Sequence, residues 1–238
     1  MKYQETRGAY LNCEKRIFEG VGAFDFPSLE PVEVDLENPQ VIGFNYAIGE
    51  KHPEDKIVHF YLDDYQFERV WNDAPRYLPI LSRFKAVMAP DFSMYTDFPK
   101  AVQIFNHYRK MWCAAYWQEH GIKVIPTICW SDESSFDWCF EGIPKHSLVC
   151  ISTVGGFGNH AEHNRELWLA GYERCLEVLE PSHILLFGKH FPEVRPYGIM
   201  TVVDNSQLKR KRTLSARTEQ SGFELPSFEG DSKLLEVI

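Results

Sequence analysis

The sequence predicts an α/β fold in which the strands of a mainly parallel sheet alternate with helices. Short apolar runs recur from residue 41 to residue 204, and most are apolar throughout, which is typical of strands covered on both faces. Longer segments with helical spacing separate these runs, and that alternation produces right-handed crossovers between parallel strands. The 238 residues are 44% hydrophobic and 25% charged, which are the proportions of a globular protein.

Each predicted element follows from a local pattern. Residues 1–40 are mixed in character and predict an irregular arm whose aromatic side chains pack on the body. Apolar runs predict strands at 41–48, 57–62, 85–89, 122–128, 147–152, 183–187 and 198–203. Helical spacing predicts helices at 65–84, 101–120, 134–140 and 161–179, and the first of them is broken at Pro75 and Pro79.

The longest predicted helix is the segment 101–120. Thr96 and Asp97 offer its N-cap, and Gly121 ends it. The spacing predicts that one face of this helix is buried, through a stripe of Val102, Phe105, Tyr108, Trp112, Ala115 and Tyr116.

The predicted strands favour a TIM-barrel-like architecture for residues 41–204, and an open doubly wound sheet is the alternative. Residues 205–238 are polar with few aromatic side chains and predict a flexible tail. The segment 209–217 of this tail carries five basic residues and no acidic one. Two interpretations stay open for it: a solubilising segment, or a contact for nucleic acid or a partner protein.

Composition excludes several classes of protein. The net charge of −9 argues against a broad basic surface for nucleic acid. The six cysteines form no C-x-x-C pair, which favours reduced thiols and argues against a structural zinc site. We find no signal-peptide pattern and no apolar run of about 18 residues, so we expect a cytoplasmic protein that does not enter a membrane.

Acidic or polar residues follow successive predicted strands, where the loops of parallel α/β folds build their sites. The candidates for catalysis are Asp63, Asp64, Asp91, Asp132, Glu133 and Lys189. Carboxylates gathered on one rim could bind Mg²⁺ or Mn²⁺, and Asp63, Asp91 and Asp132 are the candidate ligands. They could instead supply a general acid and base. A third interpretation is that Asp64, Asp97 and Asp132 only cap the helices that follow them.

Other residues are candidates for substrate binding. Tyr95 and Trp130 lie at strand ends and could stack on a ring such as a base or a sugar, although most aromatic residues belong to the core. Gly155, Gly156 and Gly158 stand between a predicted strand and a predicted helix, where backbone N–H groups could hold a phosphate. A plain connecting turn is the alternative for this glycine loop.

Several segments together resemble a known family. They are Asp63–Trp71, Pro90–Ser93, Tyr108–Arg109 with Trp117, and Trp130–Asp132. In these segments the chain resembles an uncharacterised domain-of-unknown-function family found in bacteriophages, plasmids and integrated mobile elements. The resemblance covers roughly residues 55–190. It implies a cytoplasmic protein encoded on a mobile element, and it implies no particular reaction.

Two hypotheses for function follow. The first is a hydrolase that depends on carboxylates and a metal ion and acts on a phosphate-containing substrate, either a nucleotide or a nucleic acid. In it, Lys189 or Arg109 would stabilise the developing negative charge. The second is a non-enzymatic binding protein that assists replication of the element or inhibits a host defence factor, with a host protein as its partner.

Overall fold

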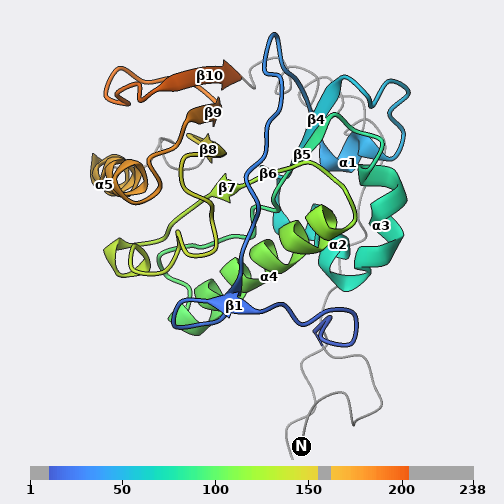
Figure 1. Ribbon diagram of the computed structural model, residues 1–238. Helices are drawn as coiled ribbons and strands as arrows, with labels where there is room; N and C mark the ends of the chain where they lie inside the picture. The colour runs from blue at the N-terminus through green and yellow to red at the C-terminus, as the bar shows by residue number, and fades with distance from the viewer. Residues whose placement is uncertain (1–10, 155–161, 204–238) are drawn as a thin grey trace, which may run out of the picture. The chain divides into compact units, whose positions relative to one another are not determined.

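The computed structural model describes residues 11–154 and 162–203 of the chain (Figure 1). Two parallel four-stranded sheets form its centre, which confirms the predicted α/β class. In both sheets the strand order follows the chain order. The first sheet contains β3 (Gln40–Gly43), β4 (Lys56–His59), β5 (Ala86–Met88) and β6 (Val124–Ile125). The second contains β7 (Thr127–Ile128), β8 (Leu148–Ser152), β9 (His183–Phe187) and β10 (Ile199–Val203).

The two sheets join at Pro126, which separates β6 from β7. Proline has no N–H group to donate, so a regular hydrogen-bond ladder is interrupted there. Its carbonyl oxygen still accepts a hydrogen bond of 2.8 Å from the amide of Cys150. The predicted strand 122–128 therefore serves both sheets, pairing with β5 before the proline and with β8 after it.

The sheets curve around a shared interior. The ring of His59 on β4 lies 4.5 Å from that of Phe187 on β9, and the Tyr61 hydroxyl lies 3.1 Å from the Cys150 thiol. Four strand spacings of about 4.8 Å would hold β4 and β9 roughly 19 Å apart in a flat sheet. Among the described strands, the outer ones, β3 and β10, each pair with a single neighbour. Closure into a TIM-barrel-like ring stays a prediction.

Helices cover the sheets on the outside. They are α1 (Phe44–Ala47), α2 (Arg69–Asn72), α3 (Ala74–Leu81), α4 (Lys100–Glu119) and α5 (Glu162–Leu179), with 3₁₀ turns η2 (Asp64–Gln66) and η3 (Glu133–Ser135). Figure 1 shows α1 to α4 around the first sheet and α5 beside the second. None of the helices in the described part of the chain is long and apolar enough to cross a membrane.

Three local predictions were wrong. The strand expected at 41–48 ends at Gly43, because Phe44 and Ala47 turn one helical face into the core. The helix expected at 134–140 is only the 3₁₀ turn η3 followed by turns. The helix α4 has Pro99 at its N-cap, without a side-chain cap, and Asp97 is exposed.

The predicted stripe on α4 was also wrong at its start. Val102 and Phe105 are exposed, whereas polar residues on other faces are buried: Gln103, Asn106, His107 and Lys110. The cause is that α4 is covered on more than one side. The N-terminal arm packs on it, so a single apolar face does not describe its environment.

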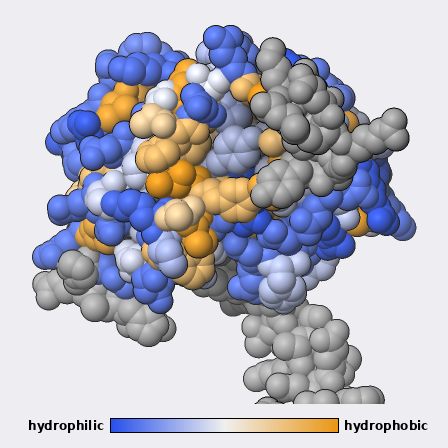
Figure 2. All heavy atoms as spheres, turned by 90° about the horizontal axis from the view of Figure 1, so that it is seen from below, coloured by the Kyte–Doolittle hydropathy of each residue, from blue (hydrophilic) through white to orange (hydrophobic). Residues whose placement is uncertain are grey.

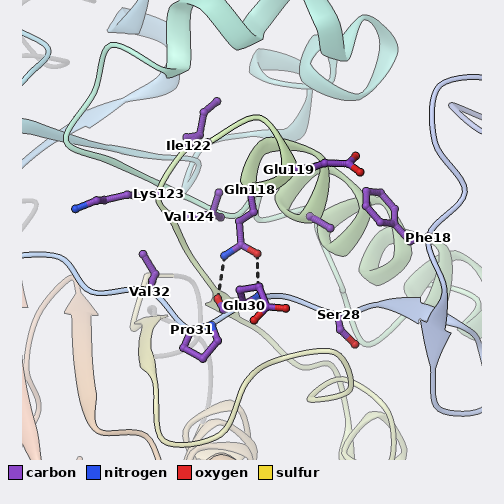
Figure 3. Close-up of a pocket in the computed structure, with 12 residues that line it drawn as sticks. Phe18, Ser28, Glu30, Pro31, Val32, Gln118, Glu119, Ile122, Lys123 and Val124 are labelled. Atoms are coloured by element: carbon purple, nitrogen blue, oxygen red, sulfur yellow. Dashed lines mark hydrogen bonds between the residues drawn. The ribbon is translucent and has the colours of Figure 1, made fainter.

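The arm is fixed by a few specific contacts. It forms a small antiparallel pair, β1 (Gly20–Val21) with β2 (Phe26–Pro27). Phe26 is fully buried, and its ring centroid lies 4.5 Å from that of His107 on α4. At Gly142, φ is +78° and a Cβ would overlap with the carbonyl of Pro27, so only glycine lets the arm pass so closely. Further along, the Gln118 side chain exchanges two hydrogen bonds of 2.9 Å with the backbone of Glu30 (Figure 3).

We therefore predict that the packing of the arm contributes to the stability of the fold. We expect Phe26→Ala to lower the free energy of unfolding by about 3–5 kcal/mol, because it removes a fully buried ring and leaves a cavity. Phe24→Ala is the matched control, since Phe24 is 42% exposed and its loss should cost less than about 1 kcal/mol. Urea unfolding followed by circular dichroism measures both changes, and equal effects would contradict this account of the arm.

Candidate functional site

A small pocket lies where strands of both sheets end. It has a volume of about 140 Å³. Its walls come from the last residues of β7 and β8, from residues that follow β4, β5, β7 and β8, and from α5: Tyr61, Asp91, Ile128, Cys129, Trp130, Ser152, Val154 and Trp168. In parallel α/β folds this end of the sheet is where the connecting loops converge on a ligand.

Asp91 is the ionisable carboxyl group of the pocket. Burial raises the pKa of Asp91 from 3.8 to about 6, and the charge of Asp64 acts in the same direction. The Lys110 ammonium and a hydrogen bond with Cys129 oppose this rise. The carboxyl group therefore changes its charge close to neutral pH, which is the behaviour expected of an acid–base catalyst.

A chain of polar groups leads from Asp91 into α4. The Lys110 ammonium, only 1% exposed, donates a hydrogen bond of 3.2 Å to the Cys129 sulfur. Cys129 in turn is hydrogen-bonded to Asp91. Burial raises the pKa of the Cys129 thiol to about 11, with Lys110 opposing the rise, so this group stays neutral between the two charges. The three residues thus form a buried cation, a neutral bridge and a carboxylate that opens on the pocket.

Tyr61 forms a fixed wall. Its hydroxyl donates to the Cys150 sulfur at 3.1 Å, and its ring stacks on Phe187 at a centroid distance of 4.6 Å. Burial raises the pKa of Tyr61 well above its usual value, so the hydroxyl remains protonated. All six cysteines are free thiols, and four of them are buried.

The other predicted carboxylates lie elsewhere on this rim. Asp64 accepts hydrogen bonds from the backbone and hydroxyl of Ser93, at 3.1 and 2.8 Å. Exposed Asp63 accepts one from Gln66 at 3.1 Å. Asp132 caps η3 by accepting from the amide of Ser134 at 2.9 Å, as its capping interpretation predicted. Glu133 is exposed.

The three carboxylates predicted to bind a metal ion are separated in the structure. Asp63, Asp91 and Asp132 do not come together, and no group of three or more histidine, cysteine, aspartate or glutamate side chains in residues 11–154 and 162–203 is arranged to hold a metal ion. Within the described part of the chain, Asp64 is the carboxylate whose charge raises the pKa of Asp91.

Of the residues predicted to bind substrate, one lines the pocket and the other described ones lie outside its lining. Trp130 lines the pocket. Arg109 is 8% exposed, pairs with Glu68 and packs 4.0 Å from the Phe92 ring centroid, so its guanidinium is part of the core. Tyr95 is 61% exposed and contacts Phe98, away from the pocket lining. Lys189 is exposed after β9. Gly155, Gly156 and Gly158 lie outside the described residues, as does the predicted tail.

The sequence did not predict a role in the site for Lys110, Cys129 or Tyr61. Lys110 was overlooked because the buried stripe of the helix was assigned to another face. A usable signal was present, since Gln103, Asn106, His107 and Lys110 stand at helical spacings of three and four residues. Such a polar cluster on a helix otherwise rich in aromatic residues indicates a buried polar network.

A larger pocket of about 430 Å³ lies at the opposite, amino-terminal end of β6 (Figure 3). The arm and the end of α4 line it, and Gln118 spans it through its bonds to Glu30. Two carboxylates line it: Glu30 is exposed, and Glu119 forms an exposed ion pair of 3.0 Å with Arg16. This pocket contains no group comparable to Asp91, so we place the candidate site at the smaller one.

Comparison with known proteins gives the family. Residues 18–204 match the family model described as a domain of unknown function, DUF4417. The chain belongs to the DUF4417 family. This confirms the predicted resemblance and extends it beyond residues 55–190.

Relatives of this DUF4417 protein are encoded by bacteriophages. The Gene 1 protein of Mycobacterium phage L5 is 36% identical over 189 residues, which are 76% of this chain and 81% of the phage protein. The Gene 1 protein of Mycobacterium phage D29 is 37% identical over 211 residues, which are 82% of this chain and 77% of that protein. No solved structure matches the chain.

The elevated pKa of Asp91 predicts a specific pH dependence of stability. Between pH 4 and pH 6 the native state holds a proton on Asp91 that the unfolded state has released, so the contribution of Asp91 to stability is lost as pH rises. We expect the free energy of unfolding to fall by about 2 kcal/mol between pH 4 and pH 6 relative to Asp91→Asn. Above pH 7 the difference between the two proteins should be constant.

Urea unfolding of both proteins from pH 4 to pH 8 measures this difference. Asp137→Asn is a control, because Asp137 is exposed and lies outside the pocket. A difference between the wild type and Asp91→Asn that does not change with pH would show that Asp91 titrates normally.

Proposed function

We propose that this DUF4417 protein is a hydrolase in which Asp91 activates a water molecule, and that its substrate is a small phosphate-containing molecule, a nucleotide. The observation that supports this most directly is the position of Asp91: a carboxyl group with a pKa of about 6 lines a concave pocket at the ends of parallel strands. A general base needs a pKa near the working pH and a position that opens on a pocket, and Asp91 meets both conditions.

In the proposed reaction, ionised Asp91 accepts a proton from water while the water oxygen attacks the substrate. The bond to the leaving group breaks, and the leaving group takes up the proton from Asp91. The enzyme thereby returns to its starting state. Lys110 and Cys129 stand behind Asp91 and stabilise its ionised form, so they act as positioning residues.

The loops after β8 and β9 favour a phosphate-containing substrate. The Thr153 hydroxyl donates a hydrogen bond of 2.9 Å to the carbonyl of Lys189, which ties the two loops together beside pocket-lining Val154. Lys189 thus brings an exposed cation to this rim. The sequence that follows Val154 is the glycine loop, for which anion binding and a plain connecting turn are the two interpretations from the sequence.

A divalent ion is a separate part of the proposal. Mg²⁺ is commonly held by one or two carboxylates together with substrate phosphates. Asp91 and Asp64 are the carboxylates available for such an ion, or for Mn²⁺. Two carboxylates are too few to hold the ion alone, so we propose that the metal ion arrives bound to the substrate phosphates.

The binding hypothesis has one observation in its favour. Apolar groups form a band on the face seen in Figure 2. The arm exposes Leu11, Ile17, Val21 and Phe24, each more than 40% accessible. Exposed apolar side chains of this kind are found where a protein partner docks.

The hydrolase proposal predicts the effect of one substitution. Asp91→Asn should lower kcat/KM for nucleotides about 100-fold or more, since the general base is lost. In the wild type, kcat/KM should rise as pH increases through about 6, because the carboxylate is the active form, and then level off. Chromatographic assays of product formation from a panel of nucleotides and short oligonucleotides measure both effects.

Two further variants distinguish a general base at Asp91 from a metal ion shared by Asp63, Asp91 and Asp132. If Asp91 acts alone, Asp63→Asn and Asp132→Asn should change activity less than about threefold. Equal losses in these two variants and in Asp91→Asn would support a shared metal ion. Assays with EDTA, Mg²⁺ and Mn²⁺ accompany them. Normal activity in Asp91→Asn would contradict the proposal.

The binding hypothesis predicts capture of a host protein through the arm. Full-length protein should retain a partner from host lysate, and a Val21→Asp and Phe24→Asp double variant should lose it. A partner retained equally by that variant would show that the arm is not the docking surface.

A further inference from the structure

The candidate pocket has flat aromatic walls and a small volume. Tyr61, Trp130 and Trp168 provide the walls, and Asp91 and Ser152 provide the polar groups. Pockets for whole drug-sized ligands begin at roughly 300 Å³, and this one is about 140 Å³. It therefore has room for a single ring system, and the rest of a larger substrate must stay outside.

Trp130 is held in place by an unusual residue of α5. Gly171 stands within this helix, where glycine destabilises relative to alanine. A Cβ at Gly171 would overlap with the indole atoms of Trp130. The glycine thus leaves space for the indole. The position of Trp130 therefore depends both on its own place after β7 and on Gly171 in α5.

Trp168 is equally fixed. Its indole N–H donates a hydrogen bond of 3.0 Å to the carbonyl of Ser152, and its ring stacks on Tyr172 at 5.4 Å with an interplanar angle of 13°. The Tyr61 ring is held by its bond to Cys150. Walls that are rigid before binding reduce the entropy lost when a ligand arrives.

The arrangement favours a neutral flat ring over a cation. Trp130 and Trp168 contact each other at 5.5 Å with a tilt of 54°, so they do not face each other across a gap as the walls of a cation cage do. The charge of Asp91 is also already opposed by Lys110. Nucleobases suit such walls, because every base has a face that stacks on an aromatic side chain.

We propose that the pocket binds the base of a nucleotide against Trp130, and that the bond hydrolysed is the N-glycosidic bond between the base and the sugar. This inference rests on the proposed hydrolase and specifies its substrate and bond. Asp91 lines the space that the base fills, and a general base acts within hydrogen-bond reach. The sugar and phosphate extend toward the rim that carries Lys189.

The reaction is balanced without a further reactant. Water attacks the anomeric carbon of the sugar, and Asp91 accepts its proton. The carbon–nitrogen bond breaks, the electron pair goes to the ring nitrogen, and the proton passes from Asp91 to the departing base. The products are a free base and a sugar phosphate.

Chromatography of the products from ribo- and deoxyribonucleoside 5′-monophosphates tests the inference. We expect free base and sugar phosphate, and no product with Asp91→Asn. If the nucleotides instead yield inorganic phosphate and an intact nucleoside, the inference is overturned while the proposed hydrolase stands. Absence of any product would overturn both.

Binding is measured independently by saturation-transfer NMR with Asp91→Asn and the same nucleotides. Saturation should be strongest on the base protons. Adding Trp130→Ala should weaken binding about tenfold or more, the effect of losing one stacking platform. Trp130→Phe should restore part of it, and Gly171→Ala should weaken it through the displaced indole.

Matched controls complete the design. Tyr65→Ala removes an aromatic residue that is 80% exposed outside the pocket, and Gly49→Ala adds a Cβ that meets nothing within 4 Å. Neither should change binding. Saturation confined to the sugar, or equal losses in Tyr65→Ala and Trp130→Ala, would overturn base binding. Displacement of the nucleotide by tetramethylammonium would show that the pocket is a cation site.

Discussion

The buried ammonium group of Lys110 is the constraint on which the candidate site depends. A charge removed from water needs compensation, because its desolvation costs several kcal/mol. Here the compensation comes from Cys129 and Asp91, at the ends of β7 and β5. The same interaction keeps Asp91 from becoming a permanently neutral acid, since burial alone would raise its pKa still further. The ammonium of Lys110, the thiol of Cys129 and the carboxyl group of Asp91 thus set both the local packing and the acid–base behaviour.

This arrangement requires the central helix to be buried on more than one side. The N-terminal arm supplies that cover through Phe26, Glu30 and the backbone around Arg16, and Gly142 permits its close approach. On the other side, the curved sheets bring residues that follow distant strands to one pocket. The short strand pieces on either side of Pro126 are central here, because they connect the two sheets and lead directly to Cys129 and Trp130.

Much of the framework could be predicted from sequence, because apolar runs and helical spacing report burial. The parallel α/β class, most strand positions and the placing of Asp91 and Trp130 beyond strand ends follow from those patterns. The hydrogen-bond partners of the side chains could not be predicted in this way. Asp64 and Asp132 also follow predicted strands, yet Asp64 accepts a hydrogen bond from Ser93, on a distant part of the chain, and Asp132 accepts one from its neighbour Ser134. Lys110 was hidden because its partner, Cys129, lies on another element, and spacing along the helix does not report such a contact.

The proposed catalysis depends on the ionisation of Asp91, which NMR titration of ¹³C-labelled aspartate carboxyl groups measures. We expect a pKa of about 6 for Asp91 in the wild type and a higher pKa in Lys110→Met, because the opposing ammonium has been removed. A pKa close to the ordinary 3.8, or one that Lys110→Met leaves unchanged, would contradict the influence of Lys110 on Asp91 and the catalytic role built on it.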